Sequence, residues 1–118
     1  SRNGVGVIAA AISPYREIRD EVRLSIEADG ARFVEVYVKA PLETLIERDV
    51  KGLYKKALAG ELPHFTGVSD PYEEPIDPEL VIESDKVSVE QGAAKIIARL
   101  VSLGLIETKE TRKVKAAI

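Results

Sequence analysis

Cysteine, methionine and tryptophan are absent from the 118 residues, and histidine occurs once, at His64. Without cysteine the chain has no disulfide framework and no thiolate metal site. A single histidine cannot build a histidine-rich metal centre, so zinc chemistry is excluded. We therefore predict no metal-binding residues in this chain.

Long apolar runs are also missing, since none approaches the roughly 18 residues that a membrane-spanning helix needs. The first residues, Ser1–Gly4, lack the character of a signal peptide. We expect a cytoplasmic protein that binds no membrane. With 45% hydrophobic and 31% charged residues, the chain has the balance of one compact domain.

The formal charge of −3 is unevenly spread. Residues 107–118 hold four basic and two acidic side chains, so this tail carries about +2 and the remainder about −5. A negative body disfavours nucleic-acid binding, which depends on many Lys and Arg contacts to phosphates. We place the domain at residues 1–106 and interpret 107–118 as a frayed, solvated tail rather than a binding arm.

Strands and helices are predicted to alternate three times. The apolar run Gly6–Ile12 is typical of a strand covered on both faces, and Ser13-Pro14 then indicates a helix start, with Ser13 as N-cap. That helix should run to Gly30 with an inward apolar stripe that includes Ile18.

Two further strand–helix pairs follow. Phe33–Val38 is β-rich and Pro41 opens a helix; Leu80–Glu83 is a short strand, and Ser88–Gln91 has the pattern of a capping box for a helix that ends at Gly104. This alternation predicts an α/β fold with a parallel sheet and helices on both faces. Ligands of such folds bind at the carboxyl ends of the strands.

Three positions should therefore lie at that edge of the sheet: Ser13, Lys39–Ala40 and Ser84–Val87. Between Asp49 and Pro78, glycines and prolines punctuate a mostly irregular segment with one short helix around Leu53–Ala59. Long excursions of this kind are usually lids or binding loops. We predict a lid over about 49–72 and expect it to be the most mobile part of the chain.

Three segments carry a family resemblance: Ile-Ser-Pro-Tyr-Arg at 12–16, Arg-Asp-Val-Lys-Gly-Leu-Tyr-Lys-Lys-Ala at 48–57, and Phe-Thr-Gly at 65–67 followed by Asp-Pro-Tyr-Glu at 70–73. In this order and spacing they resemble adenylyl-sulfate kinases, and the similarity runs from about residue 3 to residue 104. The resemblance implies a three-layer P-loop NTPase architecture that binds ATP and Mg²⁺ on the loop after its first strand.

The phosphate-binding motif G-x-x-x-x-G-K-[ST] does not occur in these residues. By the resemblance, that loop and the segment that grips the sulfonucleotide would precede Ser1. The chain thus looks like the carboxy-terminal two-thirds of a kinase, and we expect it to be inactive as an isolated fragment.

Ile12 and Ser13 match family positions that contact adenylyl sulfate. The residues alone allow Ser13 to be only an N-cap, or to face an anion at the helix N-terminus. The matching serine has also been treated as a phosphorylated intermediate in this family, but we favour direct in-line transfer, because phosphoryl transfer needs only positioning and charge neutralisation.

Lys51 could be a solvated lysine or could swing onto a phosphosulfate from the lid, and the resemblance implies the substrate contact. Arg48 matches a residue over the ATP adenine. Val87 matches a position that touches the ATP base, although the core would explain it equally well.

Phe65 lies in a Pro- and Gly-rich loop with little regular structure beneath it. It could anchor that loop, or stack on adenine, as the resemblance implies. His64 precedes it where the family commonly has glycine, and could contribute its backbone to the substrate site. Ile18 stands where the family usually has an acidic residue.

Three functions are compatible with this sequence. The first is an adenylyl-sulfate kinase that makes 3′-phosphoadenylyl sulfate in sulfate assimilation. The second is a non-catalytic regulatory domain that binds the sulfonucleotide in a fusion with sulfate adenylyltransferase. The third, a scaffold without ligand, is disfavoured by the specific lid sequence. We expect nucleotides as ligands, and a homodimer.

Overall fold

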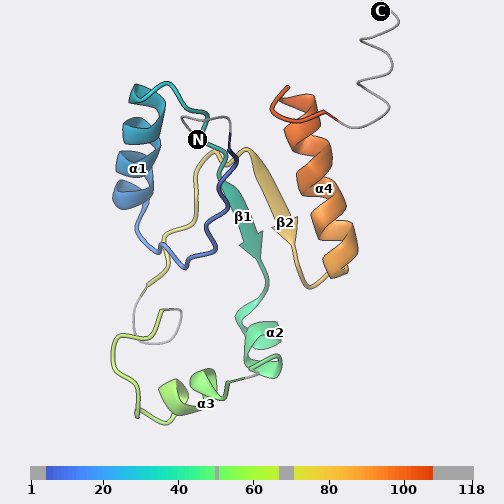
Figure 1. Cartoon of the computed structure of the whole chain (residues 1–118). Coiled ribbons are helices and arrows are strands. Elements are labelled where there is room, and N and C mark those ends of the chain that lie inside the picture. The colour runs from blue at the N-terminus through green and yellow to red at the C-terminus, as the bar shows by residue number, and fades with distance from the viewer. Residues whose placement is uncertain (1–4, 50, 67–70, 108–118) are drawn as a thin grey trace, which may run out of the picture. The chain divides into compact units, whose positions relative to one another are not determined.

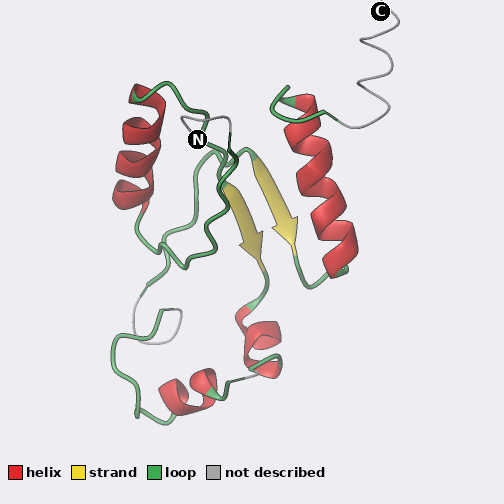
Figure 2. Cartoon of the chain, viewed as in Figure 1, coloured by secondary structure: helices red, strands yellow, loops and turns green. Residues whose placement is uncertain are grey.

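The computed structural model describes residues 5–49, 51–66 and 71–107, which contain four helices and two strands (Figures 1 and 2). Two compact units divide the chain. One comprises the residues up to 34 together with 41–77, and the other comprises 35–40 together with the residues from 78 onward. The predicted tail from residue 108 and parts of the predicted lid (residues 50 and 67–70) lie outside the described residues.

The second unit is built on two parallel strands, β1 (Val36–Lys39) and β2 (Leu80–Glu83), which lie side by side in Figure 1. Val36 pairs with Leu80 and Lys39 with Glu83, so both strands end at the same edge. β2 occupies the predicted residues. β1 starts three residues later than predicted, because its pairing partner begins only at Leu80.

Hydrogen bonds close both ends of this strand pair. At the carboxyl end, the Ser84 N–H and hydroxyl both donate to the Lys39 carbonyl, at 2.8 and 3.3 Å. At the amino end, the Glu79 carboxylate accepts from the Glu35 N–H at 3.0 Å. The Arg99 Nε donates to the Glu79 carbonyl at 2.9 Å, which ties α4 to the start of β2.

Helix α4 (Val89–Ser102) packs against β2 (Figure 1). The predicted capping box is present, with reciprocal bonds between Ser88 and Gln91 of 2.9 and 3.1 Å. Gly92 is buried where α4 meets Ile82 of β2. Gly104, at φ 74°, follows the helix end as predicted, because a left-handed residue after the C-cap suits glycine.

The first unit contains three helices: α1 (Arg16–Ala28), α2 (Leu42–Glu47) and α3 (Leu53–Leu58). Pro41 is the N-cap of α2, so the helix opens where it was predicted. Helices α2 and α3 contact each other. Helix α3 is the short helix that was predicted around Leu53–Ala59, so that prediction is confirmed.

The predicted first strand is wrong, because residues 5–12 form an irregular, exposed segment. Val7 is 78% exposed and Ile8 97% exposed. A strand exists only where a neighbour takes up its backbone hydrogen bonds, and the sheet of the described residues contains only β1 and β2. Ser13 therefore does not follow a described strand, whereas Lys39 and Ser84 do lie at the predicted edge.

Two predictions about α1 are also wrong. Its N-cap is Tyr15, so Ser13 is not the capping residue and Pro14 is not the first helical residue. Ile18 is 52% exposed, and no residue of α1 is buried. The apolar stripe of α1 has the predicted period, but its members are at most half-buried.

Very little apolar surface is fully buried. Among the described residues, only Ala57 (6% exposed) and Ile82 (4% exposed) are buried hydrophobic side chains. Large apolar side chains from both units stay open to solvent, such as Ile76 and Val89. The apolar side chains of the described residues therefore remain largely exposed and do not form a closed hydrophobic core.

Candidate functional site

Ser13 has a backbone conformation that is rare for its residue type. Its φ is 43°, in the left-handed region that is disfavoured for residues with a Cβ. The Arg19 guanidinium, one turn into α1, donates to the Ser13 carbonyl. Ile12, the residue before, is 65% exposed. Both predicted substrate contacts therefore lie on an open loop that is held by a side chain of α1.

The same guanidinium reaches a second segment of the chain, far from Ser13 in sequence. Arg19 also donates to the Glu73 carbonyl, and its Cζ lies 5.5 Å from the centre of the Tyr72 ring. One planar side chain thus fastens two carbonyl groups and covers an aromatic ring. We call Ser13–Arg16, Arg19 and Tyr72–Glu74 the Ser13 junction.

Backbone and side-chain bonds around Arg16 complete the Ser13 junction. The Glu73 N–H donates to the Pro14 carbonyl at 2.8 Å. In return, the Arg16 N–H donates to the Glu73 Oε1 at 3.0 Å, and the Arg16 Nε donates to the Glu74 carbonyl at 2.7 Å. Described residues of two motif segments that carry the family resemblance, Pro14–Arg16 and Tyr72–Glu73, therefore lie together.

The start of α3 is organised by Asp49. Its two carboxylate oxygens accept from the N–H groups of Tyr54 and Lys55, at 3.1 and 3.0 Å. Desolvation acts to raise the pKa of Asp49, but these backbone N–H groups outweigh it, so the pKa lies below its ordinary value. Gly52, at φ 66°, lets the chain turn between the carboxylate and the helix.

Phe65 has a packing partner on α3, contrary to the expectation that little regular structure lies beneath it. The Tyr54 and Phe65 rings form an edge-to-face pair with centroids 5.0 Å apart and an angle of 80° between the ring planes. His64, just before, has φ 57°, again in the left-handed region. The structure thus supplies a physical reason why glycine suits this position.

The other predicted site residues occupy separate places. Arg48 is the exposed C-cap of α2, and Lys51 is exposed in the turn before α3. Val87 is half-buried in the turn after β2, within the second unit. All the other predicted site residues belong to the first unit.

The sequence analysis did not identify the residues that hold the predicted site residues in place. Arg19 holds Ser13, Tyr54 holds Phe65, and Asp49 caps the helix that carries Tyr54. Asp49 and Tyr54 lie inside the quoted motif 48–57, and Arg19 lies one helical turn beyond Arg16. Their position in or next to the motifs was the available signal.

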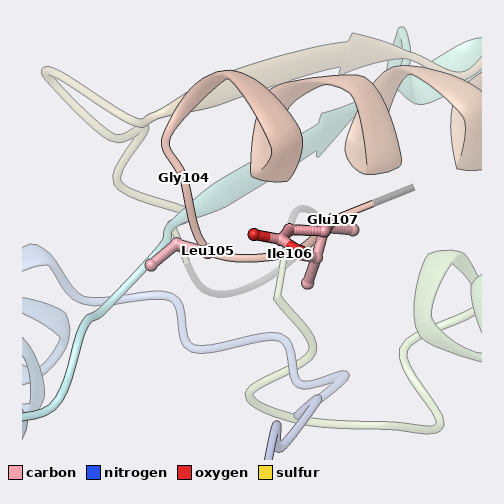
Figure 3. A pocket seen from close by; sticks show the side chains of 4 residues that line it. All are labelled: Gly104, Leu105, Ile106 and Glu107. Atoms are coloured by element: carbon pink, nitrogen blue, oxygen red, sulfur yellow. The ribbon is translucent and has the colours of Figure 1, made fainter. Parts of the chain in front are cut away.

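Three observations limit other kinds of site. Within the described residues, no group of three or more His, Cys, Asp or Glu side chains could hold a metal ion. No helix of the described residues is long and apolar enough to cross a membrane. The hollow in Figure 3 is lined by four consecutive residues, Gly104–Glu107, none of which is a predicted site residue.

Comparison with solved structures defines the class of the protein. The Mycobacterium tuberculosis APS kinase in complex with AMPPNP and APS is 42% identical, with a TM-score of 0.73, and the match covers 76% of this chain and 51% of that chain. The chain therefore has the α/β fold of a P-loop NTPase, in the class of nucleotide kinases.

The family profile described as "Adenylylsulphate kinase" matches residues 1–83, and the chain belongs to that family. The adenylyl-sulfate kinase of Myxococcus xanthus is 59% identical over 107 residues, which are 91% of this chain and 58% of that protein. A "Probable bifunctional SAT/APS kinase 2" of Sorangium cellulosum is 50% identical over 106 residues, 18% of its length. The chain spans about half the length of the single-function curated relatives it matches.

Proposed function

We propose that the protein to which this chain belongs is an adenylyl-sulfate kinase. It transfers the γ-phosphoryl group of ATP to the 3′-hydroxyl of adenylyl sulfate, and the products are ADP and 3′-phosphoadenylyl sulfate. Family membership supports this reaction class. The observation that carries the proposal is the Ser13 junction, where two motif segments of the family meet through specific hydrogen bonds.

Ser13 and Ile12 are the proposed contacts to adenylyl sulfate. The open, left-handed Ser13 loop precedes the N-terminus of α1, a place where backbone N–H groups and the helix dipole favour anions. We keep in-line transfer as the mechanism, with Ser13 positioning substrate rather than carrying the phosphoryl group. In-line transfer requires aligned substrates and neutralised charge, and no covalent enzyme intermediate.

The α3 region is proposed as the lid, over about 49–72. Asp49 and the Tyr54–Phe65 pair make part of it a folded element rather than a loose loop, and that element would present the Phe65 ring to the adenine of adenylyl sulfate. Lys51 would reach the phosphosulfate, and the His64 backbone would contact the same nucleotide. Arg48 and Val87 are the proposed contacts to the adenine of MgATP.

Substitution of Phe65 in the full-length gene product tests this assignment. Losing a stacking partner worth about 1–3 kcal/mol should lower kcat/KM for adenylyl sulfate roughly five- to 150-fold in Phe65→Ala, with ATP use almost unchanged. Phe65→Leu, the matched control, keeps apolar volume against Tyr54 but has no aromatic ring. Recovery of activity by leucine, or equal losses for both substrates, would show that Phe65 only anchors the loop.

The alternative is a regulatory domain that binds the sulfonucleotide without catalysis. The similarity to a "Probable bifunctional SAT/APS kinase 2" of Sorangium cellulosum supports fusion to or association with a sulfate adenylyltransferase as a further proposal, and it does not favour the non-catalytic function over the kinase. The two functions differ in turnover. Saturable binding of adenylyl sulfate with no ADP release by the full-length gene product would establish the regulatory function instead.

A homodimer likewise stays a prediction, which sedimentation of that product would check.

A further inference from the structure

Ser13 keeps its left-handed conformation although nothing about a serine favours it. Such conformations persist where the surroundings over-determine them, and they occur preferentially at functional sites. Two hydrogen bonds hold the loop at Ser13. The Arg19 guanidinium donates to the Ser13 carbonyl, and the Glu73 N–H donates to the Pro14 carbonyl at 2.8 Å.

Arg19 contacts both segments of the Ser13 junction: it donates to the Ser13 carbonyl, donates to the Glu73 carbonyl and covers the Tyr72 ring. The side chain is half-buried, and the bond to Glu73 joins residues 54 positions apart in the chain. The Tyr72–Glu74 segment lies at the carboxyl end of the proposed lid. Its position therefore depends on the same guanidinium that holds the substrate loop.

We infer that Arg19 is a positioning residue for adenylyl sulfate, which couples the Ser13 loop to the end of the lid through its two carbonyl bonds and its contact with Tyr72. This inference rests on the proposed function and extends it to a residue that does not touch substrate. Release of the guanidinium lets Ser13 relax toward ordinary backbone angles. The substrate contacts at Ile12 and Ser13 are then misplaced.

The chemistry requires arginine rather than any cation. A guanidinium presents several N–H donors in one rigid plane and can bond two carbonyls while its face lies on an aromatic ring. A lysine ammonium is a compact point charge on a flexible stem and cannot reproduce that geometry. Arg19→Lys therefore keeps the charge and removes the positioning.

Helix α1 offers a matched control in Arg23. Its Cζ lies 4.8 Å from the centre of the Phe33 ring, so it covers an aromatic ring as Arg19 does, and its Nη1 lies 3.6 Å from the Glu27 carboxylate one turn along α1. Both of these partners lie outside the Ser13 junction. Arg23→Lys thus reports the stability cost of losing a comparable arginine on the same helix.

The experiment compares both variants with wild type in the full-length gene product by three measurements: steady-state kinetics, the melting temperature, and hydrogen exchange at the Glu73 amide. We expect Arg19→Lys to raise KM for adenylyl sulfate roughly ten- to a hundredfold, with KM for ATP little changed. The Glu73 amide should exchange at least about tenfold faster, because its bond to Pro14 opens more often. Arg23→Lys should change neither quantity.

The outcomes separate this inference from the proposed function. Unchanged Glu73 exchange in Arg19→Lys, or equal kinetic losses in both variants, would overturn the positioning role while wild-type turnover still upholds the kinase. Wild-type protein without turnover would overturn the proposed function, and the positioning role in that reaction with it. A loss in Arg19→Lys explained by a lower melting temperature alone would make Arg19 a purely structural residue.

Discussion

At the scale of single residues, the loop before Phe65 contains a backbone conformation that its residue type disfavours. His64 has φ 57°, a conformation that costs a residue with a Cβ about 1–2 kcal/mol of conformational free energy and that glycine adopts without this cost. The family resemblance implies glycine at this place, so His64 is a departure with a conformational cost. The favourable contact between the neighbouring Tyr54 and Phe65 rings offsets part of this conformational cost.

His64→Gly should therefore stabilise the protein. After allowance for the larger chain entropy of glycine, we expect a net gain of about 0.5–1 kcal/mol, or roughly 2–4 °C in melting temperature. His64→Ala is the control, because alanine has the same penalty at positive φ and should bring no gain. Equal stabilisation by both substitutions would assign the effect to the imidazole rather than to the backbone.

Asp49 makes the start of α3 sensitive to acid. Its pKa is lowered in the folded state, so its stabilisation is fully present above its ordinary pKa of about 4 and is lost as the pH falls through the lowered value. The amide signals of Tyr54 and Lys55 should therefore titrate below about pH 4 in NMR spectra. Asp49→Asn should abolish this titration. Amide signals that titrate unchanged in Asp49→Asn would contradict the cap.

At the scale of elements, two glycines of the second unit should respond oppositely to substitution by alanine. A Cβ at Gly92 would lie 3.6 Å from the Ile82 Cγ2, an ordinary contact, so Gly92→Ala should stabilise α4 by roughly 0.5–1 kcal/mol. Gly104, at φ 74°, should lose about 1 kcal/mol in Gly104→Ala. Denaturant unfolding measures both changes, and a loss in Gly92→Ala would mean that α4 packs closer to β2 than described.

Elements were predictable where their signals are local. The capping box at Ser88 and the proline before α2 satisfy backbone groups within a few residues, so these helix starts were predicted correctly. The structure of the apolar run 6–12 was predicted wrongly. A strand needs hydrogen bonds from a neighbouring strand, and an apolar sequence does not show whether that neighbour is present.

At the scale of the whole molecule, we predict that the 118 residues on their own have no kinase activity. They contain no G-x-x-x-x-G-K-[ST] segment, and positioning and charge neutralisation by such a segment are most of this catalysis. An assay of ADP release with adenylyl sulfate checks this. Turnover of roughly 1–100 per second, the range of ordinary kinases, would refute the prediction. The full-length gene product is the positive control.

The sequence supplies candidate site residues, whose roles stay predictions, but it does not supply their arrangement. The motifs placed Ser13, Lys51 and Phe65 at family positions through their order and spacing alone. Which residues hold them could not be read in the same way, because Arg19 and Glu73 meet across 54 residues of chain. No local period or propensity encodes such a contact.

The amino-acid sequence by itself determined the family, the α/β class and the ends of most helices, because these depend on motif order, on hydrophobic period and on capping within a few residues. Only the tertiary structure decided the left-handed Ser13, the bridge made by Arg19 and the ring contact of Phe65. Those features arise when segments far apart in the chain pack together, and the backbone then adopts angles that no single residue prefers.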